Sequence, residues 1–374
     1  MGLDRSTASI RSPVMLDKHD DNLPESARPI SSAADSDPII GLHALAVYAD
    51  APIEAVTCGG SVVTNGQGAF MTSLRVGAVS RNYFNLPLWL GIEAGFFSSE
   101  GLSLEVHLIE AIDQVTDGLA SGALDLALNV TENTLLNRES GGDLTIIGGN
   151  VNRLPFSLIA RPGVRKVSDL RGAKIGVSSL RAGSSSLVMR LLADAGLHHP
   201  ADYTLVAVGP ILSRWERLRS GEIDAGLQGA PLNHIALDLG FSDLGSPRGL
   251  FPDFQFTSLD AKRSWLKTHG DTATRFLRAF IRAHRLFYTD PDAVAAVACR
   301  ETGVERQYAD QAWREYTRDT IFPRDGRASV AAVQSLIEVS SLIRDLPTRA
   351  SMRAETYIDH ALMDAAEQSL RPGQ

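Results

Sequence analysis

The sequence predicts an α/β protein made of two related lobes, and two observations lead to this prediction. From residue 73 onward, short apolar strands alternate with helical segments, a pattern typical of parallel sheets covered by helices. In addition, the frame L-x-S-G-x-(L/I)-D-x-x-L occurs twice, at 119–128 and at 218–227. Each copy has the pattern of a helix that ends at glycine and turns into a strand. Two copies within two similar runs indicate lobes of the same build.

The individual elements follow from the apolar periodicity. In the first run we expect strands at 74–79, 103–109 and 124–129, and helices at about 86–99 and 112–121. In the second run we expect strands at 157–161, 174–178, 203–208 and 223–227, and helices at 185–195 and 211–220. Gly148 and Gly149 have the pattern of turn glycines, and after about Thr257 the chain is expected to be helical to its end.

The first 72 residues differ in character from the rest. They are rich in Ser, Asp, Pro, Gly and Ala, without clean periodicity, so we expect a disordered or loosely attached leader. No basic segment precedes a continuous apolar core, so no secretory signal is visible. Met71 is a candidate for the true start of the protein.

Composition excludes several classes of function. The net charge of -8 argues against a nucleic-acid binder, which needs a cationic face for phosphates. No apolar run reaches the roughly 18 residues of a membrane helix, so we expect no membrane span. The two cysteines and the spacing of the histidines predict neither a metal site nor a disulfide framework.

Three segments carry a resemblance to a known family. Residues 87–106 (PLWLGIEAGFFSSEGLSLEV), 168–177 (SDLRGAKIGV) and 220–225 (SGEIDA) resemble, in order and spacing, the solute-binding proteins of nitrate/sulfonate/taurine ABC transporters. That group includes a branch similar to the pyrimidine synthase of thiamine biosynthesis. The resemblance covers roughly residues 73–345.

The resemblance implies a type II periplasmic-binding-protein fold, with two α/β lobes, two hinge crossovers and a ligand between the lobes. The implied division is a leader at 1–72, a first lobe at 73–155 plus 257–345, a second lobe at 156–256, and a helical tail at 346–374. The crossovers would lie near 153–158 and 252–258.

The implied function is binding of a small anionic organic compound, a sulfonate or carboxylate, for an ABC importer. The expected partners are this ligand and an ABC permease, and the binding protein is expected to be a monomer without a cofactor. The resemblance implies a periplasmic location, whereas the missing signal leaves a cytoplasmic one as the alternative.

An enzyme on the same fold is the alternative function: a decarboxylase, a desulfinase or a pyrimidine synthase acting on a small aromatic or heterocyclic acid. The synthase branch implies pyridoxal phosphate held by a first-lobe lysine, with a histidine and a cysteine-rich motif nearby. Here no lysine occurs between Lys18 and Lys166, and no cysteine cluster exists. Cys58 and Cys299 are not placed to act as nucleophiles, so we expect no catalytic residue.

Ligands of open α/β sheets gather beyond the carboxyl ends of the strands, and several loops meet this condition. The loop at 80–85 offers polar groups beside aromatic faces, which is the usual composition of a small-molecule pocket. The predicted contacts there are Asn82, Tyr83, Phe84 and Asn85.

After the strand that ends at Leu128, Asn129 and Thr131 could hold an anion at a helix start, although Glu132 would repel one if it faced the cleft. Gln228 follows the last strand of the second lobe and is a further predicted contact.

The loop at 178–186 gives the strongest anion signal, since glycine, serines and an arginine occur together there. Its predicted contacts are Arg181, Gly183, Ser184 and Ser185. Arg153 and Arg214 could add charge, but for each we expect a surface salt bridge.

Overall fold

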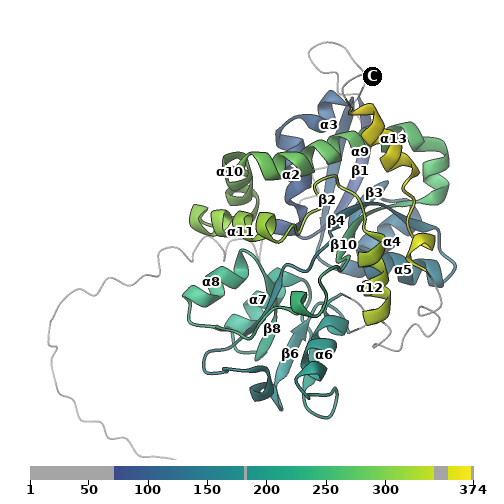
Figure 1. Cartoon of the computed structure of the whole chain (residues 1–374). Helices are drawn as coiled ribbons and strands as arrows, with labels where there is room; N and C mark the ends of the chain where they lie inside the picture. The colour runs from purple at the N-terminus through teal and green to yellow at the C-terminus, as the bar shows by residue number, and fades with distance from the viewer. Residues whose placement is uncertain (1–70, 181–182, 341–352, 372–374) are drawn as a thin grey trace, which may run out of the picture. The chain divides into compact units, whose positions relative to one another are not determined.

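The computed structural model describes residues 71–180, 183–340 and 353–371, all within one compact unit of the chain, Glu54–Gln374. The predicted leader, except for its last two residues, and the start of the predicted tail lie outside the described residues. Within the described part, two five-stranded sheets form the centres of two lobes (Figure 1).

The first sheet has the strand order β2-β1-β3-β10-β4, with β10 antiparallel to both of its neighbours. Its strands are β1 (Thr72–Val79), β2 (Leu102–Ile109), β3 (Leu126–Val130), β4 (Leu144–Val151) and β10 (Thr257–Lys262). After β1 the chain forms a short 3₁₀ turn, η2 (Tyr83–Asn85), and then α2 (Leu86–Glu93) and α3 (Phe96–Ser99). Helix α4 (Ile112–Ser121) follows β2, and α5 (Thr131–Glu139) follows β3.

The second sheet has the order β7-β6-β8-β5-β9. Its strands are β5 (Phe156–Ala160), β6 (Lys174–Val177), β7 (Thr204–Ala207), β8 (Ala225–Gly229) and β9 (Ser242–Asp243). Helices α6 (Ser184–Asp194), α7 (Ile211–Arg219) and α8 (Leu232–Asp238) pack on it, and η3 (Val167–Leu170) and η4 (Pro247–Gly249) lie in its loops.

The chain after β10 is helical and returns to the first lobe. It forms α9 (Arg263–Thr289), α10 (Pro291–Thr302), α11 (Arg306–Arg318), α12 (Val330–Ser340), η7 (Ala354–Thr356) and α13 (Ala361–Ser369). One face of α9 is apolar and lies in the core, where Phe276, Phe280 and Phe287 are fully buried. Helix α9 packs on α2, α3 and α13, while α4 covers the other side of the sheet, so each face of the sheet has its own hydrophobic cluster.

The α/β fold predicted from the sequence is confirmed, and most expected elements agree with the structure to within about two residues. The single helix expected at 86–99 is instead two helices, because Gly95 adopts a left-handed conformation with φ +69° between them. The helix expected after Thr257 begins only at Arg263, since Thr257–Lys262 forms β10.

The sequence predicted a turn at Gly148 and Gly149, but both residues lie inside β4. Another part of the chain packs directly against this strand: the Gly149 N–H donates to the Gly326 carbonyl at 2.8 Å. A Cβ at position 149 would lie 2.2 Å from the Arg327 carbonyl oxygen, so only glycine fits there.

Candidate functional site

A cavity of about 40 Å³ lies where the carboxyl ends of strands from both sheets meet. The first lobe contributes the end of β1, the loop after it, the start of α4, β3 and the start of β10. The second lobe contributes β5, the residue after β6, and the first turn of α7. The described residues that line this pocket are Val79, Asn82, Phe84, Asn85, Ile112, Leu128, Val130, Phe156, Ser178, Pro210, Ile211, Arg214, Phe256 and Thr257.

The loop after β1 brings Asn82, Phe84 and Asn85 to the pocket, as the sequence placed them. The two asparagines also hold the loop together: the Nδ2 atoms of Asn82 and Asn85 donate to the Val79 carbonyl at 2.9 and 3.1 Å. Asn82 Oδ1 accepts from the N–H of Phe84. Their side-chain donors are therefore already engaged by the backbone.

Three phenylalanine rings form one wall. Phe84, Phe156 and Phe256 pack edge to face, with ring centroids 4.8 to 5.8 Å apart. Tyr83 is not among the lining residues. Its ring packs against Tyr316 of α11, at a centroid distance of 4.9 Å, and against Phe287 of α9.

The loop between β6 and α6 is closed by two serines. The Ser178 N–H donates to Ser184 Oγ at 2.9 Å, and the Ser184 N–H donates to Ser178 Oγ at 3.1 Å. Gly183 lies between them in a conformation with φ +74° and ψ -115°, which is essentially restricted to glycine. Ser184 and Ser185 are buried in the first turn of α6, and Arg181 lies outside the described residues.

Arg214 is the only charged side chain among the described lining residues. It is 2% exposed, and it crosses the second sheet over Gly176 and Gly226, where a Cβ would lie 3.3 and 2.8 Å from its side chain. Its Nε donates to the Leu227 carbonyl at 2.8 Å, and its Nη1 donates to Ser184 Oγ at 3.3 Å.

No carboxylate of the described residues pairs with Arg214, so the surface salt bridge expected from the sequence is wrong. Burial lowers the pKa of Arg214 to about 10, so the guanidinium remains charged at neutral pH. The sequence carried a signal for this position: Ile211, Arg214, Trp215 and Leu218 follow the spacing of one helix face, and all four are buried. By contrast, Arg153 forms the expected surface pair, with Asp253 at 3.4 Å.

Asn129 and Thr131 belong to a buried polar network next to the pocket, and neither is among the lining residues. Asn129 Nδ2 donates to Thr134 Oγ1 at 3.2 Å, and Thr131 Oγ1 donates to Ser258 Oγ at 3.0 Å. Both chains of contacts end on the carboxylate of Asp260, which accepts from Thr134 and Ser258. Burial raises the pKa of Asp260 to about 7, against the opposing effect of these hydrogen bonds. Sequence reasoning missed Asp260 because its strand was expected to be a helix.

Glu132 does face the second lobe. The first turn of α5 places it there, 1% exposed, and its Oε2 accepts from the Gly183 N–H at 2.7 Å. A first-lobe carboxylate therefore caps the amino-terminal end of a second-lobe helix.

Gln228 of β8 is fully buried and is not among the lining residues. Its side-chain oxygen and nitrogen have no hydrogen-bond partner among the described residues.

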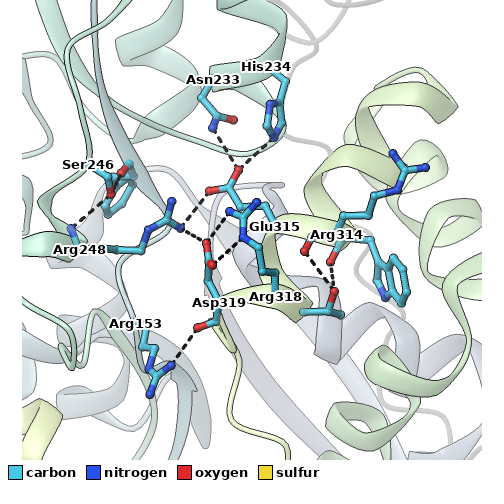
Figure 2. Close-up of polar contacts among 12 residues, drawn as sticks. Arg153, Asn233, His234, Ser246, Arg248, Arg314, Glu315, Arg318 and Asp319 are labelled. Carbon is cyan, nitrogen blue, oxygen red and sulfur yellow. Dashed lines mark hydrogen bonds and ion pairs between the residues drawn. The ribbon is translucent and has the colours of Figure 1, made fainter.

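A second polar contact joins the lobes away from the pocket (Figure 2). Glu315 of α11 accepts from Arg248 Nη1 at 3.0 Å and from Asn233 Nδ2 at 3.3 Å, and its Oε2 lies 3.0 Å from His234 Nε2. Asn233 and His234 lie on α8, and Arg248 lies on η4, so all three belong to the second lobe. Arg248 also contacts Asp319 at 2.9 Å.

Neither a metal site nor a membrane span is found in the part of the chain that the structure describes. No three His, Cys, Asp or Glu side chains gather there in a way that could hold an ion. No helix there is both long and apolar enough to cross a membrane.

The fold and the position of the pocket define the class of protein. The chain has the fold of periplasmic binding proteins, as solved relatives show. The alkanesulfonate-binding protein SsuA from Xanthomonas axonopodis pv. citri, bound to MOPS, matches with a TM-score of 0.65 and 20% identity, covering 78% of this chain and all of that one. The nitrate-binding protein NrtA from Synechocystis PCC 6803 matches with a TM-score of 0.65 and 14% identity, covering 80% of this chain and 89% of that one.

The chain belongs to the NMT1/THI5-like family, whose model matches residues 83–294, more than half of the sequence. The resemblance stated from the sequence is thereby confirmed.

The curated relatives carry two kinds of name. The 4-amino-5-hydroxymethyl-2-methylpyrimidine phosphate synthase of Schizosaccharomyces pombe is 26% identical over 56% of this chain. YtlA of Bacillus subtilis, which has only a provisional name as a binding protein, is 25% identical over 58%. The matches span 63% and 66% of the lengths of these two relatives.

The residues of the pocket do not fit the pyridoxal phosphate that the synthase branch implies. No lysine or histidine is among the described lining residues, so this pocket offers no amine to hold the aldehyde. We therefore derive no chemistry through that group.

Proposed function

We propose that this protein is the solute-binding component of an ABC importer for a small anionic organic compound, held between the two lobes. Buried Arg214 is the observation that carries the proposal. A buried charge without an opposite charge costs several kcal/mol, and proteins seldom keep one without a use for it. A ligand carboxylate or sulfonate would supply the missing partner through the planar donor fork of the guanidinium.

The proposed mechanism is closure of two lobes, residues 73–155 with 257–345 on one side and residues 156–256 on the other. Phe84 and Thr257 would contact the ligand from the first lobe, and Ser178 and Arg214 from the second. Because these contacts form together only when the lobes meet, the ligand stabilises the closed state.

Of the residues predicted from sequence, Asn82, Phe84 and Asn85 remain proposed direct contacts. Gly183 and Ser184 were predicted as direct contacts, but they do not line the pocket, and we propose instead that they support Arg214. In the transport setting, a permease would recognise the closed form on the periplasmic side.

The test is a calorimetric and thermal-shift screen of the full chain against carboxylates, sulfonates and nitrate, followed by mass spectrometry of each mixture. We expect binding with the ligand unchanged, and a loss of about 10- to 100-fold in affinity for Arg214→Met, since a charge-assisted hydrogen bond is worth about 1.5–3 kcal/mol.

The matched control is Arg217→Met on the same helix, where the arginine is exposed and pairs with Glu222. This variant should bind like the wild type. A chemically converted ligand would instead support the enzymatic alternative, and equal affinity in the Arg214 and Arg217 variants would reject the proposed site.

A further inference from the structure

One edge of the first sheet is open. β2 is its outermost strand and, among the described strands, pairs only with β1, along all of Leu102–Ile109. The opposite edge strand, β4, is covered by other backbone: the Ile146 N–H donates to the Tyr357 carbonyl at 2.9 Å. The edge strands of the second sheet, β7 and β9, are only four and two residues long. β2 is therefore the longest uncovered edge among the described residues.

The outer side of β2 presents backbone groups without a partner. The Ser80 N–H donates to the Ile109 carbonyl at 3.1 Å, so the backbone groups of Ile109 point toward β1. Because successive residues of a strand point to opposite sides, the N–H and C=O groups of Leu104, Val106 and Leu108 point outward. No backbone hydrogen bond of the described residues reaches them. Such an edge is a template for a further strand.

The two faces of β2 differ in chemistry. Leu104, Val106 and Leu108 are half-buried and pack against the apolar cluster that includes the buried face of α9. On the other face, the side chains of Glu105 and His107 are 49% and 39% exposed, and Glu105 Oε1 lies 3.2 Å from His107 Nε2. Natural edges are commonly blocked by charges such as lysine, which repel a second copy. A carboxylate and an imidazole two residues apart instead complement one another.

We infer that β2 is an interaction surface on which two copies of this chain pair antiparallel, with Val106 facing its counterpart on a twofold axis. In this register Leu104 lies opposite Leu108 of the other copy, and the outward groups of the two strands form about six hydrogen bonds. Glu105 lies opposite His107 of the other copy, in the pairs that exchange no hydrogen bonds and whose side chains are therefore closest. The charge pattern is self-complementary, as a twofold interface requires.

The charges also select this register. A shift of two residues in one direction would place Glu105 opposite its own counterpart, and a shift in the other direction would do the same for His107. Like charges directly opposite each other destabilise a strand pair. The inference goes beyond the proposed function and does not depend on it, and it replaces the monomer expected from the resemblance with a dimer. A strand pair buries less than the roughly 1,600 Å² of a standard interface, so this dimer is weak.

The first measurement is sedimentation velocity of the full chain between about 1 and 200 µM. We expect a reversible equilibrium of monomer and dimer, with a Kd of about 10–100 µM. Hydrogen exchange on the same samples should slow at Leu104, Val106 and Leu108 as the dimer forms, because their amides then acquire partners.

An exchange of charges tests the register, with circular dichroism to verify that each variant is folded. The double variant Glu105→Lys/His107→Lys makes both members of each facing pair cationic, and His107→Glu makes both anionic. Each variant alone should dimerise at least about tenfold more weakly than the wild type, whereas an equimolar mixture should form a heterodimer at least as tight as the wild-type dimer. The control is Glu222→Lys, at an exposed position of the second lobe that pairs with Arg217, which should dimerise like the wild type.

Each outcome bears on the inference directly. A wild-type chain that stays monomeric at about 200 µM would overturn it. A dimer of unchanged affinity in both charge variants would also overturn it, since the contact would then lie elsewhere. Variants that fail to dimerise alone and fail to combine would overturn the antiparallel register. Ligand binding is measured separately, so the proposed function stands or falls independently of these results.

Discussion

Arg214 makes a prediction about stability as well as binding. If its function is to hold a ligand anion, the ligand-free protein carries the cost of a buried, uncompensated charge. Arg214→Met removes that charge at similar volume, at the expense of the hydrogen bonds to Leu227 and Ser184. We therefore expect the ligand-free variant to have a Tm equal to or higher than that of the wild type, while it loses binding. A fall in Tm of several degrees would instead assign the arginine a structural role.

Asp260 predicts an unusual dependence of stability on pH. Its pKa is raised from 3.8 to about 7 in the folded state, so the folded protein binds a proton that the unfolded chain releases between these values. The stability contributed by this proton is present in full below about pH 4 and is lost as the pH rises to about 7, at up to roughly 1.4 kcal/mol per pH unit. Asp260→Asn should flatten this part of the curve of unfolding free energy against pH, measured by urea titration from pH 4.5 to 8.

A matched control for Asp260 is Asp253, which is exposed and pairs with Arg153. Asp253→Asn should leave the slope between pH 4.5 and 7 in place. An unchanged slope in Asp260→Asn as well would show that other groups bind the proton.

At the residue scale, the sequence predicted which loops lie at the pocket, but not which side chains there are buried or which hydrogen bonds they form. Asn82, Phe84 and Asn85 could be predicted because a loop after a strand places them at the sheet edge. Arg214 was misjudged because arginine is usually exposed, although its spacing with Ile211, Trp215 and Leu218 put it on the buried face of its helix. Asn129 and Thr131 could be placed at the strand end, but their turn toward Asp260 depends on a partner about 130 residues away.

At the element scale, the loop that begins α6 depends on Gly183. An alanine there would need a backbone conformation that residues with a Cβ avoid, and its methyl group would lie 2.4 Å from Ser178 Oγ, which is held by Ser184. We expect Gly183→Ala to cost about 2–3 kcal/mol of unfolding free energy in urea titration and to weaken ligand binding.

Gly196→Ala is the control for this prediction. Gly196 has a similar φ of +78°, but no atom lies within 4 Å of its added Cβ, so it should lose only about 1 kcal/mol. Equal losses in the two variants would show that the packing against Ser178 does not matter.

The elements missed from sequence have a common physical cause. β10 carries the buried polar residues Ser258 and Asp260, so it lacks the apolar pattern of a strand, and its partners β3 and β4 are distant in the chain. β4 was obscured by Gly148 and Gly149, which serve as a close packing surface rather than as a turn. Local periodicity detects a strand through regularly spaced apolar side chains. Neither β4 nor β10 has such a pattern in its sequence, although both strands are buried.

At the scale of the whole molecule, the contacts of Glu315 link lobe closure to the wall of the pocket. Glu315 joins α11 to Arg248, Asn233 and His234 of the second lobe. The next residue, Tyr316, packs on Tyr83, whose neighbour Phe84 lines the pocket. Movement of α11 relative to α8 would therefore shift Tyr316 against Tyr83 and could displace Phe84 in the aromatic wall of the pocket.

We expect Glu315→Gln to shift the ligand-free protein toward an open state, because it removes the charge that attracts Arg248 and His234 across the lobes. Small-angle scattering should then show a larger radius of gyration without ligand, and binding of the ligand identified in the screen should weaken by the fraction of closed protein lost.

The pH dependence of the Glu315 contact has a defined sign. Although burial acts to raise the pKa of Glu315, His234, Arg248 and Asn233 hold it below its usual value. The contact therefore contributes its full stability above about pH 4.5 and loses it as the pH falls through the folded pKa. Glu216 of α7 provides the control, because its exposed side chain pairs, among the described residues, only with Arg219 of the same helix, so Glu216→Gln should leave the scattering curve unchanged. A wild-type radius of gyration in Glu315→Gln would mean that α8 and α11 stay together as the lobes open, which would make this contact part of the hinge and not of the closed state.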